Sequence, residues 1–208
     1  LAGTHLRIAL NAYSFNQPLR DGSMTLSGLV RYCAQNGIDA LDATGYYFPG
    51  YPKVPTDDYI YALKREAFLN GVTIHGTGVR NDFTSPSQPD IDLVKNWIEV
   101  AEKLGASIIR VFSGPKAPEG KTFDQVLEWM IPAFQECADY GKKHGVLLGL
   151  QHHNDFLKTA DETLRVVERV NHPWFGVLLD IGSLRQADPY PEIEKLVRRE
   201  SVVGFVMG

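Results

Sequence analysis

Short apolar runs rich in β-branched residues alternate along the chain with longer amphipathic segments. The runs lack a helical period, which is typical of strands buried in a parallel sheet. Seven such runs occur, at residues 7–15, 37–45, 71–79, 106–114, 145–153, 175–183 and 202–208. The segments between them carry helix-start signals, among them Thr25, Thr56 and Asp161. Each unit therefore predicts a strand followed by a helix.

Glycines recur every 34 residues, at Gly37, Gly71 and Gly105, where a helix is expected to end and a strand to begin. This period also occurs in helical repeats such as the tetratricopeptide. Half of each unit, however, is an apolar run without helical periodicity, whereas a helix–helix repeat is amphipathic throughout. Parallel β/α units are the better interpretation.

Units of this length favour an α/β fold of the (β/α)₈ barrel type over a doubly wound sheet. No GxGxxG motif opens the first helix, and polar residues gather at the carboxyl ends of the strands, where barrels place their active sites. Seven strands are predicted where a barrel needs eight. We therefore expect residues 1–208 to form a single TIM-barrel domain that lacks its last strand and helix units.

Composition narrows the possible partners and locations. The 21 basic and 25 acidic residues give a formal charge of −4 without a basic run, which argues against nucleic acid as a partner. Cys33 and Cys137 lie in helical patterns and are expected to be small buried thiols in a reducing compartment. No segment has the length of a membrane span, and the first residues lack the pattern of a secretory signal, so we expect a cytoplasmic protein without membrane contact.

Alternation along the strands places a set of polar side chains inside the predicted barrel. In the third run, Thr73, His75 and Thr77 share one face, which we expect to point inward. The same rule applied to the other runs gives a ring contributed by six strands. Its members are Asn11, Asp42, His75, Arg110, Gln151, His153 and Asp180. Single members can be structural, but a whole ring of buried polar groups indicates a binding site.

Two members of the ring carry charge after strongly apolar runs. Asp180 is a candidate ligand for a divalent metal, and Arg110 a candidate for binding a phosphate or a sugar hydroxyl. An ion pair between them across the barrel is the structural alternative. His152 and His153 cannot both face inward from a regular strand, so we assign His153 to the site and His152 to the surrounding packing.

The loop GYYFPGYP, residues 45–52, follows the second strand and is rich in tyrosine. Its tyrosines can stack on a sugar ring and bind its hydroxyls, or they can simply cover the mouth of the barrel. Both interpretations stay open from the sequence.

Several motifs together give the chain a resemblance to a known family. They are LNAYSFNQPLRDG, GIDALDATGYYFPGYP, TGVRNDF, IIRVFSG, GLQHHNDFLKTADETL and GVLLDIGS, within about residues 7–198. With these motifs the chain resembles the xylose isomerase-like barrels often labelled sugar phosphate isomerase/epimerase. The last two motifs are the most specific.

The resemblance implies a divalent metal, Mn, Zn or Mg, held by a Glu of strand five, an Asp of strand six, a His of strand seven and a Glu of strand eight. The two glutamates of that family also move a proton next to the substrate carbonyl while the metal stabilises the enediolate. The positions that correspond here are Gln151 and Asp180, which the resemblance makes the catalytic and metal-binding residues. Asn11, Asp42, His75, Arg110 and His153 are then the expected substrate-binding residues.

The sequence departs from that family at several positions. Gln151 stands in place of the Glu, and an amide cannot act as a general base. Ser183 replaces a His often found three residues after the Asp, and the run at 202–208 contains no His. These departures argue against proton-transfer epimerisation by this chain.

Two functional hypotheses follow, and a third is disfavoured. The first is a sugar or sugar phosphate isomerase/epimerase acting on a ketose or related polyol. The second is a non-catalytic sugar-binding or regulatory barrel. The zinc-dependent endonucleases of the same superfamily are disfavoured by the acidic charge and the scarcity of metal-spaced histidines. The open edges of an incomplete barrel also predict a homodimer.

Overall fold

A computed structural model describes residues 7–85, 87–153, 155–199 and 201–206 of the chain. Within them, every predicted apolar run contains a strand, and the strands form one parallel sheet in the order β1 to β7. Their bounds are β1 Ala9–Asn11, β2 Ala40–Asp42, β3 Thr73–Gly78, β4 Ile108–Val111, β5 Leu147–Gln151, β6 Phe175–Asp180 and β7 Val202–Val206. The prediction of a parallel β/α fold is confirmed.

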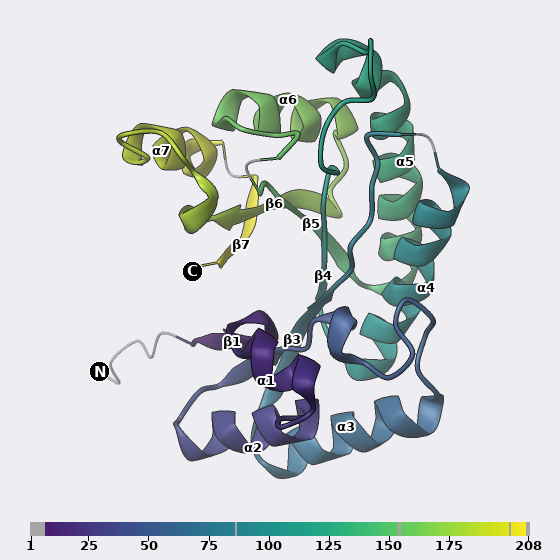
Figure 1. Ribbon diagram of the computed structural model, residues 1–208, viewed down its shortest axis with the longest axis vertical. Coiled ribbons are helices and arrows are strands. Elements are labelled where there is room, and N and C mark those ends of the chain that lie inside the picture. The colour runs from purple at the N-terminus through teal and green to yellow at the C-terminus, as the bar shows by residue number, and fades with distance from the viewer. Residues whose placement is uncertain (1–6, 86, 154, 200, 207–208) are drawn as a thin grey trace.

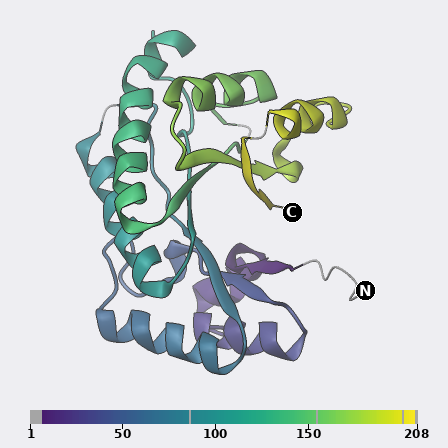
Figure 2. The same cartoon turned by 180° about the vertical axis from the view of Figure 1, so that it is seen from behind.

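Helices connect the successive strands and cover one face of the sheet. They are α1 Asn16–Asp21, α2 Leu26–Gln35, α3 Asp57–Leu69, α4 Gln88–Leu104, α5 Phe123–His144, α6 Ala160–Val170 and α7 Tyr190–Arg198. Three short 3₁₀ turns follow strands, η1 Ala12–Phe15, η2 Gly45–Tyr47 and η3 Ile181–Ser183. Figures 1 and 2 show the sheet curving so that helices α2 to α6 lie on its outer side. The architecture is a TIM-barrel-like half-barrel of seven parallel strands.

The ends of the helices follow local sequence signals. Thr25 and Thr56 accept hydrogen bonds from the N–H groups of Gly28 and Tyr59, as N-caps do. The predicted start at Asp161 is wrong by two residues, because Thr159 caps α6 in a capping box with Glu162.

Glycines end the helices at the predicted positions. Gly37, Gly71 and Gly105 adopt φ values of 67°, 68° and 79°, a left-handed conformation in which a Cβ is strained. The period of 34 residues thus reflects repeated helix-to-strand junctions of the barrel.

The hydrophobic core lies between the outer face of the sheet and the helices. Leu41, Ile109, Leu148 and Val177 from four strands are completely buried in it. The alternate positions of the same strands face the other side, where the predicted polar ring begins. Two-residue alternation therefore divides each strand between core and site.

A register shift between β2 and β3 changes which residues face inward. Leu41 pairs with Ile74, but Asp42 pairs with Gly76, so one extra residue is inserted in β3. After this bulge Thr77 is completely buried and donates to the carbonyl of Ala43 at 2.8 Å. A Cβ on Gly78 would instead meet the Arg110 guanidinium, so the glycines face inward. The prediction of a single inward face carrying Thr73, His75 and Thr77 is wrong for Thr77.

The two cysteines are free and buried, as predicted. Burial raises the pKa of Cys137 to about 12, so its thiol stays protonated near neutral pH. Among the helices of the described ranges, none has the length and apolarity needed to cross a membrane. The predicted homodimer stays a prediction.

Candidate functional site

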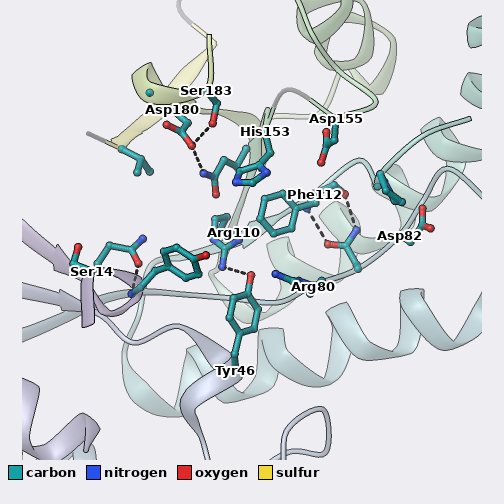
Figure 3. Close-up of a pocket in the computed structure, with 18 residues that line it drawn as sticks. Ser14, Tyr46, Arg80, Asp82, Arg110, Phe112, His153, Asp155, Asp180 and Ser183 are labelled. Atoms are coloured by element: carbon teal, nitrogen blue, oxygen red, sulfur yellow. Dashed lines mark hydrogen bonds between the residues drawn. The ribbon is translucent and has the colours of Figure 1, made fainter. Parts of the chain in front are cut away.

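A pocket of about 920 Å³ opens at the carboxyl ends of the strands. Five of the seven predicted ring residues line it. They are Asn11 from β1, Arg110 from β4, Gln151 from β5, Asp180 from β6, and His153, which lies two residues after β5. Figure 3 shows side chains from these separate elements around one space. The sequence rule of alternation at strand ends therefore brings most of the predicted residues together.

Gln151 and Asp180 form the polar centre of one wall. The Gln151 Nε2 donates to Asp180 Oδ2 at 2.5 Å, and the Ser183 hydroxyl donates to the same oxygen at 2.7 Å. All three side chains are buried, with at most 8% of their surface exposed. Asp180 is thus held as a hydrogen-bonded carboxylate beside a neutral amide, with η3 providing the serine.

His152 supports this wall from behind, as its assignment to the packing predicts. Its ring is 3% exposed, and its Nε2 accepts the backbone N–H of Asp180 at 3.3 Å. Accepting through Nε2 requires that nitrogen to be unprotonated. Burial lowers the pKa of His152, with the nearby Asp180 opposing that effect. The neutral ring therefore fixes the backbone at the end of β6.

Arg110 occupies the opposite part of the pocket and does not pair with Asp180. Its Nη2 donates to the Tyr46 hydroxyl at 2.7 Å, and its guanidinium carbon lies 5.3 Å from the Tyr46 ring and 4.5 Å from the Phe112 ring. Cation–π contacts of this kind stabilise a charge against an aromatic face. The ion pair left open by the sequence is not found among the described residues, because each partner has other contacts.

His153 and Phe112 extend this aromatic wall. The two rings lie edge to face with centroids 5.5 Å apart, and the His153 side chain is exposed to the pocket. Asn81 holds Phe112 in place, since its amide accepts the Phe112 N–H at 2.9 Å and donates to the Phe112 carbonyl at 2.7 Å. A loop after β3 thereby fixes the end of β4.

Two predicted residues lie outside the pocket lining. Asp42 is mostly buried, and its Oδ1 has no hydrogen-bond partner among the described residues. Burial raises the pKa of Asp42, while Arg110, His75 and Thr44 act in the opposite direction. His75 is exposed at the bulge. Asp42 therefore interacts with Arg110 through charge without lining the pocket.

The tyrosine loop contributes both to packing and to the pocket. Tyr46 lines the pocket, whereas the Tyr47 hydroxyl donates to Asn16 at 2.8 Å and Tyr51 packs against Trp97. Burial raises the pKa of Tyr47 to about 12. Of the two sequence interpretations, covering the barrel describes most of the loop, and Tyr46 alone faces the pocket.

Sequence reasoning missed three charged residues of the lining, Arg80, Asp82 and Asp155. All three lie on loops after strands, where no periodicity indicates direction. Burial raises the pKa of Asp155, although the backbone N–H of Phe156 and the charge of His153 oppose it. Its Oδ1 has no hydrogen-bond partner among the described residues. The only sequence signal for them was their place directly after an apolar run.

The residues described do not by themselves fit a divalent metal. No group of three His, Cys, Asp or Glu side chains in the described ranges could hold one. Asp180 offers a carboxylate and Gln151 an amide oxygen, but the Gln151 amide already donates to Asp180. Divalent cations in proteins commonly take four to eight ligands. Two adjacent donors are therefore an incomplete site.

The fold and the pocket define a class: parallel β/α barrels with a binding site at the carboxyl ends of the strands. The sequence profile of a family described as Xylose isomerase-like TIM barrel matches residues 30–205. The chain belongs to this family, as the resemblance predicted. A comparison with curated proteins finds no significant sequence match.

Solved structures share the fold at low sequence identity. A D-psicose 3-epimerase from Clostridium cellulolyticum H10, solved with D-tagatose, matches with a TM-score of 0.77 and 19% identity over 98% of this chain and 73% of its own. The IOLI protein, solved with a bound zinc atom, has a TM-score of 0.78 and 14% identity over 97% and 72%. A probable 3-DHS dehydratase, AsbF, from Bacillus anthracis has a TM-score of 0.74 and 19% identity over 96% and 72%. These likenesses establish the fold.

Proposed function

We propose that the protein binds a sugar or a related polyol in the pocket at the strand ends. The observation that carries this proposal is the convergence of Asn11, Arg110, Gln151, His153 and Asp180 from separate elements on one pocket. Amides, a carboxylate and a guanidinium supply the mixed donors and acceptors that sugar hydroxyls need. The rings of Tyr46 and Phe112 supply apolar faces for the C–H side of a sugar. The epimerase solved with D-tagatose supports this ligand class.

Sugar binding requires only hydrogen bonds from these residues, whereas proton transfer requires a group that gains and loses a proton. Gln151 can orient a hydroxyl through its amide oxygen, and Asp180 can accept one through the oxygen that Gln151 and Ser183 leave free. Neither arrangement needs Gln151 to ionise. A sugar-binding or regulatory barrel is therefore the function that the geometry supports best.

Calorimetry and thermal unfolding test the proposal. D-fructose, D-tagatose and myo-inositol serve as neutral probes, and at least one is expected to raise the midpoint of unfolding as its concentration rises. Gln151→Ala should weaken binding about ten-fold, since it removes a buried hydrogen-bonding group. Gln17→Ala, on the exposed surface of α1, is the matched control. If neither these sugars nor their acidic derivatives bind, or if Gln151→Ala binds them as tightly as the control does, the proposal is wrong.

A second candidate function is acid–base chemistry on the bound sugar, of the isomerase or epimerase type. The observation that favours it is Asp155, a pocket carboxyl whose pKa burial raises above its ordinary value, as is common for groups that transfer protons. His153, two residues away, lines the same pocket. A divalent metal of that family would require donors additional to Gln151 and Asp180.

Isotope exchange distinguishes this candidate from simple binding. A bound ketose in D₂O should take up deuterium next to its carbonyl if Asp155 moves that proton. Asp155→Asn should abolish the exchange while leaving ligand affinity within about three-fold, because the amide preserves shape and polarity. Binding without any exchange in the unaltered protein would leave the first function and reject the second.

A further inference from the structure

Arg110 presents a buried charge without a carboxylate partner. Its side chain is 5% exposed, and of the five N–H groups that a guanidinium carries, one is used in the bond to Tyr46. None of the ion pairs formed by the described residues includes Arg110. Asp42 influences it only through a longer-range charge interaction. A buried guanidinium in this state has donors free to bind an anion.

Arg80 brings a second guanidinium to the same place. Its guanidinium carbon lies 5.5 Å from the Tyr46 ring, the ring that Arg110 also contacts, and it lines the same pocket. The Arg80 backbone N–H donates to the Tyr51 hydroxyl at 2.9 Å, which fixes the base of the side chain. In the part of the chain that the structure describes, Arg80 has no ion pair either. Two unpaired arginines thus flank one tyrosine.

Two carboxylates of the pocket lining, Asp180 and Asp82, are hydrogen-bonded to other groups. Asp180 accepts from Gln151 and Ser183, and Figure 3 shows it on the other side of the pocket from Tyr46. Asp82 accepts both the N–H and the hydroxyl of Thr84, at 2.9 and 2.5 Å. Arg80 and Arg110 are therefore the two cations that contact the Tyr46 ring, while the Asp180 wall provides neutral and acceptor groups.

We propose that the natural ligand carries an anionic group, a carboxylate or a phosphate, which binds to Arg110 and Arg80 beside Tyr46. This inference rests on the proposed sugar-binding function and narrows its ligand to acidic sugars. The planar guanidinium groups of the two arginines match either oxyanion. The hydroxyl groups of the same ligand then reach Gln151 and Asp180. Neutral ketoses fill only that second part of the pocket.

Matched probes separate the two anion sources. D-fructose, D-fructose 6-phosphate, D-gluconate and inorganic phosphate are titrated into the unaltered protein, Arg80→Gln and Arg65→Gln. Arg80 is exposed, so its variant is expected to fold, and Arg65 on α3 lies outside the pocket lining and serves as the control. An acidic probe should bind at least about ten-fold more tightly than D-fructose, and Arg80→Gln should remove most of that advantage. Arg110→Lys provides a second variant that keeps the charge but loses the planar geometry.

Each outcome has a defined meaning. Preference for the sugar phosphate or for gluconate supports the inference and identifies the oxyanion. Equal binding of D-fructose and the acidic probes, unchanged by Arg80→Gln, overturns the inference and leaves the proposed function standing. Binding of inorganic phosphate that Arg80→Gln weakens, with no gain from the sugar part, supports the anion site and rejects the sugar function. Binding of none of the four overturns both.

Discussion

Gln151 donates a hydrogen bond to Asp180 at 2.5 Å between the ends of two paired strands. The contact joins a neutral amide to a carboxylate where both groups are buried. Two carboxylates at this distance would repel, and one of them would retain a proton. The amide therefore gives the pair a fixed geometry without a shared proton, which suits ligand orientation more than proton transfer.

Gln151→Glu is expected to make stability depend on pH. The new carboxyl lies beside Asp180, so its folded-state pKa is raised above the ordinary value. Its contribution to stability is then present at low pH and lost as pH rises through the folded-state pKa. We expect a loss of about 1–3 kcal/mol relative to the unaltered protein at about pH 8, and little loss at about pH 4. Urea unfolding across this range measures it.

Gln125→Glu is the matched control for that variant. Gln125 forms the capping box of α5, in which Glu serves equally well. If Gln151→Glu matches this control at every pH, the close buried contact with Asp180 is not present in solution.

Much of the site follows from sequence, because strands impose a period of two and barrels gather strand ends. This reasoning identified Asn11, Arg110, Gln151, His153 and Asp180 in the pocket lining. It failed where the backbone departs from a regular strand. The bulge in β3 turned Thr77 outward and replaced it on the inner face with Gly78.

Strand periodicity does not predict the side-chain directions of loop residues. Arg80 and Asp155 follow strands on segments whose course depends on tertiary contacts, such as the bond from the Arg80 N–H to Tyr51. Their side-chain directions come from packing between distant segments, which one sequence does not encode locally. The contact of both Arg80 and Arg110 with the Tyr46 ring therefore follows only from the three-dimensional structure.

Gly78→Ala is expected to disturb Arg110 more than it disturbs the fold. A Cβ at this position would lie 2.5 to 2.8 Å from three guanidinium atoms of Arg110. The guanidinium must move, which breaks its bond to Tyr46. We expect about ten-fold weaker binding of acidic probes and a loss of about 1–3 kcal/mol in unfolding free energy.

Calorimetry and denaturant unfolding check both parts of this expectation. Gly28→Ala in α2 is the control, since a Cβ there meets the flexible Met24 side chain and Ala favours the helix. Unchanged binding by Gly78→Ala would show that Arg110 does not depend on this glycine.

Asp42→Asn is expected to raise stability at neutral and alkaline pH. Burial raises the folded-state pKa of Asp42 above its ordinary value of 3.8, so ionisation costs more in the folded protein than in the unfolded chain. The unaltered protein therefore loses stability as pH rises through the folded-state pKa, and the variant does not. A gain of about 1 kcal/mol at about pH 8, vanishing below the ordinary pKa, is expected from urea titrations. The exposed Asp58→Asn should show no such gain.

His152→Gln is expected to reduce the stability that the protein loses on acidification. Burial lowers the folded-state pKa of His152 below its ordinary value of 6.5, so the unfolded chain binds a proton that the folded protein excludes. The stability of the unaltered protein therefore falls as pH drops from about 6.5 toward the folded-state pKa. In the variant, a Gln Oε1 can still accept the Asp180 N–H without being protonated.

Thermal unfolding between about pH 5 and pH 8 measures this slope, with His144→Gln, at the end of α5 and outside the pocket lining, as the control. The variant should lose less stability on acidification than either the control or the unaltered protein. Ligand affinity should follow the same order, because protonation of His152 removes the acceptor that holds the Asp180 backbone and so loosens the carboxylate that faces the ligand. Identical slopes in all three proteins would show that His152 is not the group whose burial fixes this wall of the pocket.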